Sequence, residues 1–155
     1  MTLAMGWSLS VALPALLALL LVSAGIEDAR TRNIANWKNA TVALLAPAWW
    51  WVSGYTPWPD VALQVLLAGI VFAGFVGAFA LGQMGGGDVK LIGALALWLP
   101  LHPLLQMLIA MSVGGGLLTL VMLAERWWRG GGEVEVPYGV AIVIAALLFL
   151  PRTVS

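Results

Sequence analysis

Residues 61–93 of the chain read "VALQVLLAGIVFAGFVGAFALGQMGGGDVKLIG". The first part, 61–81, carries no charge. At about 1.5 Å of rise per residue, it is long enough to cross a hydrocarbon core of roughly 30 Å as a helix. Three glycines then precede an acid and a base, Asp88 and Lys90, before the chain becomes apolar again. The stretch predicts a membrane helix with ionisable residues directly beside it.

The composition extends this interpretation to the whole chain. Of its 155 residues, 62% are hydrophobic and 9% are charged, and the mean hydropathy is +0.99. A soluble domain of this length needs more polar surface. The net charge of zero gives no basic field for nucleic acid, and the absence of cysteine excludes disulfides, thiolate chemistry and cysteine zinc sites. We expect an all-α polytopic membrane protein with a single domain, residues 1–155.

Six apolar stretches are candidate transmembrane helices. The first is read as a retained helix, because no Lys or Arg precedes it and it is longer than the core of a signal peptide. The stretches 40–53, 91–99 and 138–150 are short for a full span. The six are residues 3–25, 40–53, 61–81, 91–99, 104–124 and 138–150.

Basic residues indicate the orientation. Alternate connections are basic, whereas the turns 54–60 and 100–103 contain no Lys or Arg. Under the positive-inside rule this favours six crossings with both termini outside, and most tryptophans, including 49–51, are expected at the interface. Arg152, near the carboxyl end, is the one basic residue that this arrangement does not place on the cytoplasmic side. The basic residues on the cytoplasmic side would be Arg30, Arg32, Lys38, Lys90, Arg126 and Arg129.

This topology places Asp28 and Asp88 on the same cytoplasmic face, where the chain meets the membrane. Ionisable residues at that depth are costly and often functional. Two carboxylates held close together cannot both ionise easily, so one can act as a base and the other as an acid, as in aspartic proteases. The spacing does not itself bring them together. Asp88 could instead cap a helix, and Asp28 could be a solvated acid balanced by nearby arginines.

Glycines mark two further features. Gly85, Gly86 and Gly87 would let a substrate backbone approach the acid closely, or would form a plain flexible linker. Small residues at every fourth position, 69, 73 and 77, and the triplet 114–116 predict faces for close helix packing.

The remaining polar residues have simpler interpretations. Asp60 is expected to cap a helix on the opposite face, and the single histidine, His102, lies far from both acids and lacks partners for a metal site. Glu27 neighbours Asp28 and could in principle replace it. Glu133 and Glu135 are expected to be solvated, or to hold a basic leader peptide.

Three motifs resemble one known family. "GGGDVKL" at 85–91 resembles the GxGD signature of membrane aspartyl proteases, in the form found in type IV prepilin peptidases. "DARTRNIAN" at 28–36 resembles their other motif, an Asp followed six residues on by Ile-Pro-Asn. "VPYGVAI" at 136–142 is similar to the stretch that opens the last helix in the short peptidases of tight-adherence (Flp) pili. The motifs are in family order and cover most of the chain.

The resemblance implies roles for individual residues. Asp28 and Asp88 become the catalytic pair. The glycines 85–87 become the structural and substrate-binding loop of the signature, with Lys90 as a neighbour of uncertain role. The chain departs from the pattern at Ala35, where proline is usual, and we expect a looser turn there.

The resemblance also implies an activity. We expect an aspartic endopeptidase of the bacterial inner membrane that cleaves the leader from pilin-like precursors at the cytoplasmic face, with no metal or organic cofactor. Membrane lipids are its other expected partners, nucleic acid is not one, and the oligomeric state is left open. Larger relatives carry a cysteine-bearing insertion and also methylate their product, so peptidase activity alone is expected here. The alternatives are a small proton-coupled transporter and a non-enzymatic subunit for pilus assembly.

Overall fold

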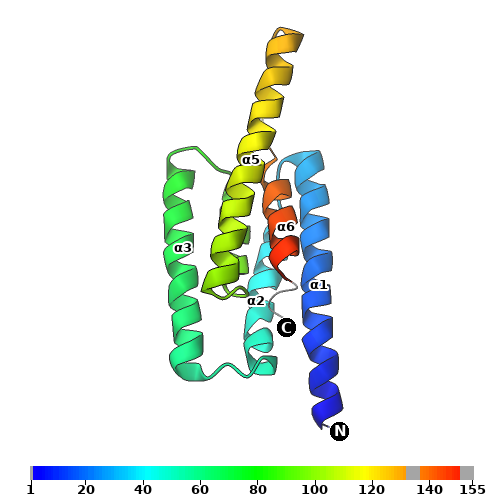
Figure 1. Cartoon of the computed structure of the whole chain (residues 1–155), viewed down its shortest axis with the longest axis vertical. Helices are drawn as coiled ribbons and strands as arrows, with labels where there is room; N and C mark the ends of the chain where they lie inside the picture. The colour runs from blue at the N-terminus through cyan, green and yellow to red at the C-terminus, as the bar shows by residue number, and fades with distance from the viewer. Residues whose placement is uncertain (1, 132–136, 151–155) are drawn as a thin grey trace.

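A computed structural model describes residues 2–131 and 137–150, which contain six α-helices and no strand. Successive helices run in opposite directions, so that α1, α3 and α5 end at the end of the bundle where α2, α4 and α6 begin (Figure 1). A short turn, η1 (Pro57–Val61), leads into α3. The helices are α1 (Thr2–Thr31), α2 (Asn36–Val52), α3 (Ala62–Ala80), α4 (Gly86–Ala96), α5 (Leu101–Arg129) and α6 (Tyr138–Phe149).

Three segments are long and apolar enough to cross a membrane, namely Leu9–Thr31, Pro57–Ala80 and Leu101–Arg129. This identifies the chain as a membrane protein. The other helices are shorter: α2 has 17 residues, α4 has 11 and α6 has 12. At about 1.5 Å per residue, α4 and α6 are each under roughly 20 Å long, shorter than a hydrocarbon core.

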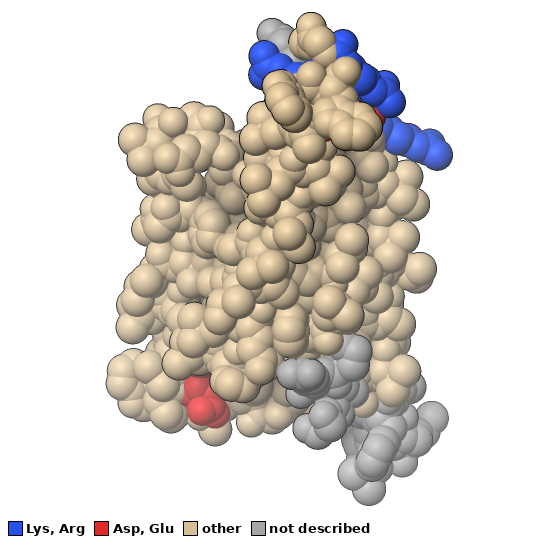
Figure 2. All heavy atoms as spheres, turned by 45° about the horizontal axis from the view of Figure 1, so that its top comes forward, with Lys and Arg blue, Asp and Glu red and all other residues tan. Residues whose placement is uncertain are grey.

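Charged side chains are concentrated at the ends of the bundle. Figure 2 shows Lys and Arg gathered at the end where α5 finishes, and no charged side chain over the middle of that face. The basic residues of the helices belong to the same end in sequence, because they lie in the last turns of α1 and α5 and near the first turns of α2 and α4. The bundle therefore has one basic end and a wide uncharged band.

The predicted charged connections are wrong in their extent. The sequence predicts a link between two spans at 26–39, but α1 continues to Thr31 and α2 begins at Asn36. In the same way α5 continues through the polar stretch to Arg129, which forms an exposed ion pair with Glu125 at 2.7 Å. A helix satisfies the hydrogen bonds of its own backbone. It can therefore continue through charged residues beyond the apolar stretch. Basic side chains in a last turn also suit the helix dipole.

The helix α4 lies at the centre of the core. Its C-terminal carbonyl groups end inside the bundle and need partners there. The buried Gln64 of α3 donates to the carbonyl oxygens of Ala96 and Leu99 at 2.6 and 2.8 Å, and the Trp50 indole donates to Leu97 O at 2.8 Å. The buried residues of α4 are Asp88, Val89, Leu91, Ile92, Ala94, Leu95 and Ala96.

Two tryptophans expected at the membrane interface lie in this core instead. The buried rings of Trp49 and Trp98 are stacked with their centroids 5.8 Å apart, and the Trp98 indole donates to Val42 O at 2.8 Å. Trp51, in contrast, is 79% exposed. Consecutive residues point about 100° apart around a helix, so a run of three aromatic residues cannot all face the lipid.

The two predicted small-residue faces have different outcomes. A methyl group at Gly115 would stand 2.8 Å from Tyr138 Cε1, so close packing of α5 on α6 is confirmed there. At Gly69 and Gly77 a methyl group would meet nothing within 4 Å. The prediction that this face of α3 packs closely is therefore wrong within the chain.

Candidate active site

Asp28 lies in the last turns of α1, where α6 begins beside it. Its side chain is buried, at 4% exposure, and Oδ2 accepts a hydrogen bond from the Val140 N–H at 3.2 Å. The Gly139 N–H also bonds this carboxylate. A methyl group at Gly139 would stand 2.6 Å from Asp28 Cγ. The acid thus packs directly against backbone atoms at the start of α6, and it is not a solvated acid.

Asp88 is the third residue of α4, whose N-cap is Gly85. It is therefore not the N-cap itself, although the Gly85 N–H does bond its carboxylate. The side chain is buried, at 8% exposure. Burial raises the pKa of Asp88 to about 6, and the charge of Asp28 raises the pKa as well. The structure thus brings the two acids close enough for one to influence the protonation of the other.

The glycines before Asp88 form the start of the helix. Gly86 and Gly87 are its first two residues. A methyl group on Gly87 would stand 3.4 Å from Ile34 Cβ, and Gly87 O accepts a hydrogen bond from Asn39 Nδ2 at 3.1 Å. A methyl group on Gly86 would stand 3.3 Å from the Phe79 ring. Gly87 therefore lets α4 approach the connection between α1 and α2 closely, and Gly86 lets it approach Phe79 of α3.

A partly buried ion pair, in which the Glu27 side chain is 31% exposed, ties α1 to α2 one residue away from Asp28. Lys38 Nζ lies 2.8 Å from Glu27 Oε2 and also donates to Ser23 Oγ at 2.7 Å. Lys38 is buried, at 8% exposure, and a charge at such a site requires a partner. Sequence reasoning missed this role for Lys38. The separation of 11 residues between Glu27 and Lys38 spans two helices, so no helical periodicity reveals the pair.

The residue that departs from the family motif takes part in the same cluster. The Ala35 N–H donates to Glu27 Oε2 at 3.3 Å, a bond that proline could not make. The expected looser turn is therefore wrong in one respect, because the backbone at this position is held by a hydrogen bond. The Glu27 carboxylate is bonded by Lys38 and by the Ala35 N–H. Asp28 is therefore the acid that faces α6.

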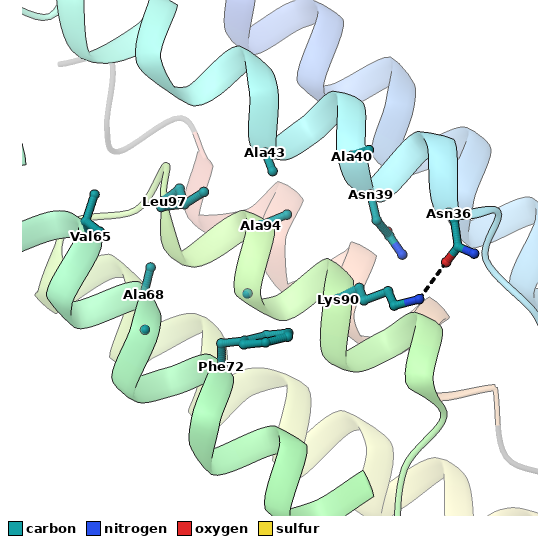
Figure 3. Close-up of a pocket in the computed structure, with 12 residues that line it drawn as sticks. Asn36, Asn39, Ala40, Ala43, Val65, Ala68, Phe72, Lys90, Ala94 and Leu97 are labelled. Carbon is teal, nitrogen blue, oxygen red and sulfur yellow. Dashed lines mark hydrogen bonds between the residues drawn. The ribbon is translucent and has the colours of Figure 1, made fainter.

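Lys90 lies on another side of α4 from Asp88. Two residues correspond to a rotation of about 200° around a helix. Lys90 Nζ donates to Asn36 Oδ1 at 2.8 Å on the side of α2 (Figure 3). Both residues line a groove of about 500 Å³ between α2, α3 and α4, and the rest of that lining is almost entirely apolar. The described structure thus separates Lys90 from the two acids.

The remaining polar candidates lie elsewhere. Thr56 donates to Asp60 Oδ2 through its N–H at 2.9 Å and through its hydroxyl at 2.8 Å. Asp60 thus bonds the N-cap residue of η1 and is not itself the N-cap of a helix. His102 contacts Gln106 Nε2 at 3.2 Å near the start of α5. Glu133, Glu135 and Arg152 lie outside the described residues.

Comparison with known proteins identifies the family. Residues 15–120 match the model of the type IV leader peptidase family. The chain belongs to this family. The match includes both acidic motifs but ends before the predicted Pro-Tyr-Gly stretch. No curated protein and no solved structure matches the chain significantly. Membership makes the protein a membrane peptidase whose substrate class is prepilin-like.

Proposed function

We propose that this leader peptidase is an aspartic endopeptidase in which Asp28 and Asp88 form the catalytic pair. The observation that carries the proposal is the pairing itself. Two acids 60 positions apart in the sequence are both buried at one end of the bundle, and the charge of one raises the pKa of the other. Structural ion pairing does not explain this arrangement, because neither acid forms a salt bridge in the part of the chain that the structure describes.

A carboxylate pair that holds one proton can hydrolyse a peptide bond without a covalent intermediate. The ionised member takes a proton from water, and the water oxygen bonds to the scissile carbonyl carbon. The protonated member gives its proton to the carbonyl oxygen at the same time. Breakdown of the tetrahedral intermediate then breaks the C–N bond, and the leaving amine receives the proton that was first taken from water. One hydroxyl of the intermediate returns a proton to the second carboxylate as the new C=O forms, which restores the pair.

The proposed substrate is a Flp-type pilin precursor, cut at the cytoplasmic face of the bacterial inner membrane. The basic end of the bundle supports this orientation under the positive-inside rule. Asp28 and Asp88 lie at that end, because α1 finishes there and α4 begins there. A precursor whose hydrophobic helix lies in the bilayer would present its short leader at the same level.

The test is cleavage in vitro. Purified protein in detergent is mixed with a precursor that has a short basic leader before a hydrophobic helix, and the products are identified by mass spectrometry. Asp28→Asn and Asp88→Asn should each reduce kcat/KM at least about a thousandfold, while the protein stays folded in the membrane. Asp60→Asn is the matched control, because it makes the same chemical change at the other end of the bundle and should leave kcat/KM unchanged.

The outcome that would overturn the proposal is substantial turnover by either dyad variant. Proton flux through liposomes that contain the protein, together with no cleavage of the precursor, would instead favour a proton-coupled transporter.

Cysteines introduced at Arg32 and Thr56 test the orientation. Only the second should react with an impermeant thiol reagent added outside intact cells, and labelling of both from one side would contradict it.

A further inference from the structure

The start of α6 holds Asp28 in a way that has no counterpart at Asp88. Asp28 accepts hydrogen bonds from two successive backbone N–H groups, those of Gly139 and Val140, whereas among the described residues Asp88 accepts from one backbone N–H, that of Gly85. The N–H groups at the start of a helix lack the full set of carbonyl partners found further along it, and they favour a negative charge. The Val140 N–H is shared, because it also donates to Pro137 O at 3.2 Å. These donors favour the ionised form of Asp28 and oppose the cost of burying its charge.

The contact depends on a glycine. A methyl group at residue 139 would stand 2.6 Å from Asp28 Cγ and 2.7 Å from Oδ2. Real Cβ atoms do not approach other atoms so closely, so any side chain here must displace the carboxylate or the start of α6. Only at a glycine can the backbone donors approach the acid to hydrogen-bonding distance in this geometry.

We propose that the start of α6 sets the roles of the two acids, because it holds Asp28 ionised as the base that takes a proton from water and leaves Asp88 as the acid that protonates the carbonyl oxygen. Gly139 is then a positioning residue that acts through Asp28. This inference rests on the proposed function, because it assigns the two roles within the same pair.

The other charged groups near Asp28 are consistent with this assignment. Directly after α1, the positive charge of Arg32 acts on Asp28, and Glu27 of α1 is neutralised by Lys38 of α2. On α4, Asp88 is the facing acid. On α6, the nearest titratable group is Tyr138, whose hydroxyl lies 3.4 Å from Thr119 Oγ1 of α5. Within the described residues, Asp28 is thus influenced by the charge of Arg32 without forming an ion pair, whereas no cation is among the groups that act on Asp88.

The first test is Gly139→Ala, assayed for precursor cleavage across pH. We expect kcat to fall at least about tenfold with little change in KM, since Asp28 acts in the chemical step. The acidic limb of the pH profile should move to higher pH, because Asp28 loses donors that favour its ionised form. Loss of packing alone would lower activity without moving that limb.

Two controls match this variant. Gly115→Ala introduces a methyl group 2.8 Å from Tyr138 Cε1, so it disturbs the same start of α6 without approaching Asp28. Val140→Ala shortens a side chain and keeps the N–H that bonds Asp28. Neither should move the acidic limb. The inference is wrong if Gly139→Ala leaves the limb in place, or if Gly115→Ala moves it equally.

A second measurement applies even if Gly139→Ala does not fold. Infrared titration of the two dyad variants follows the carboxylic acid band of the remaining Asp. The band should persist to higher pH in Asp28→Asn, where Asp88 remains, than in Asp88→Asn, where Asp28 remains. The reverse order overturns the assignment of roles, while the proposed function stands as long as both variants are inactive. Activity in either variant would instead overturn the proposed function.

Discussion

The two sides of α4 differ in how completely the chain fills them. On the side of α6, the contact between α6 and α1 is tight, because methyl groups at Gly139 and Gly25 would stand 2.6 Å from Asp28 Cγ and 3.3 Å from a methyl carbon of Val143. Toward α3 lies the groove of about 500 Å³, and a methyl group at Gly69 on its wall would meet nothing within 4 Å. The acids lie on the filled side, where packing fixes their positions.

This difference separates two requirements of a membrane protease. Proton transfer needs carboxylates held to a fraction of an ångström, which only close packing and backbone hydrogen bonds provide. The open side is less constrained within the chain, because α3 buries only Gln64 and Ala68, although Phe72 of α3 packs closely on Gly93 of α4. Mutations on the filled side should therefore change chemistry and pH dependence, whereas those on the open side should mainly change stability.

The largest expected effect tests whether the acids act as one unit. Asp28→Asn and Asp88→Asn each destroy the pair of carboxyl groups that shares a proton. The double variant should therefore be about as inactive as either single variant. The measurement is kcat/KM for precursor cleavage by the two single variants and the double variant. If the losses multiplied, the two acids would act independently, and the closely packed site would not be a dyad.

A second prediction concerns the loss of folding stability when the buried Asp88 ionises. A pKa of about 6 for Asp88, against 3.8 ordinarily, means that the folded chain holds this proton more tightly than the unfolded chain. Stability should therefore fall as pH rises from about 4 to about 6, by at most about 3 kcal/mol. Asp88→Asn carries no such charge, so it should match the parent near pH 4 and unfold at a higher temperature at pH 7.

The measurement is the thermal midpoint in detergent at both pH values, with Asp60→Asn as the control. Asp60 is exposed and bonded by Thr56, so its replacement should bring no gain at pH 7. An Asp88→Asn variant that is less stable than the parent at pH 7 would show that the carboxylate stabilises the fold in its ionised form.

The sequence predicted those features that hydropathy and motif spacing determine. It predicted the helices that contain the uncharged stretches. Two motifs and the topology also led to the prediction that Asp28 and Asp88 pair, which stays a proposal. The family match over residues 15–120 confirms the resemblance. The exact ends of the helices could not be predicted, because charged residues such as those before Thr31 are compatible with both a helix and a loop once they lie beyond the apolar stretch.

The sequence could not predict contacts that depend on the relative rotation of helices. The ion pair of Lys38 with Glu27 joins two helices whose facing sides no periodicity specifies. The small residues of α3 looked like a packing face, yet the structure leaves Gly69 open, because composition does not say which neighbour a face meets. The contact of Gly139 with Asp28 spans 111 positions in the sequence and depends on the placement of α6.

The smallest expected effect compares two glycines on the walls of the open groove. A methyl group at Gly93 of α4 would stand 2.6 Å from Phe72 Cδ2, whereas Gly69 of α3 has free space. Gly93→Ala must displace the Phe72 ring and should lower the free energy of unfolding by roughly 1–2 kcal/mol. Gly69→Ala should leave it unchanged or raise it by up to about 1 kcal/mol, since alanine favours a helix. Thermal midpoints in detergent measure both, and neither variant should change the pH profile of cleavage. Equal destabilisation by the two changes would mean that α3 lies closer to its neighbours than this structure places it, and the contrast between the two sides of α4 would disappear.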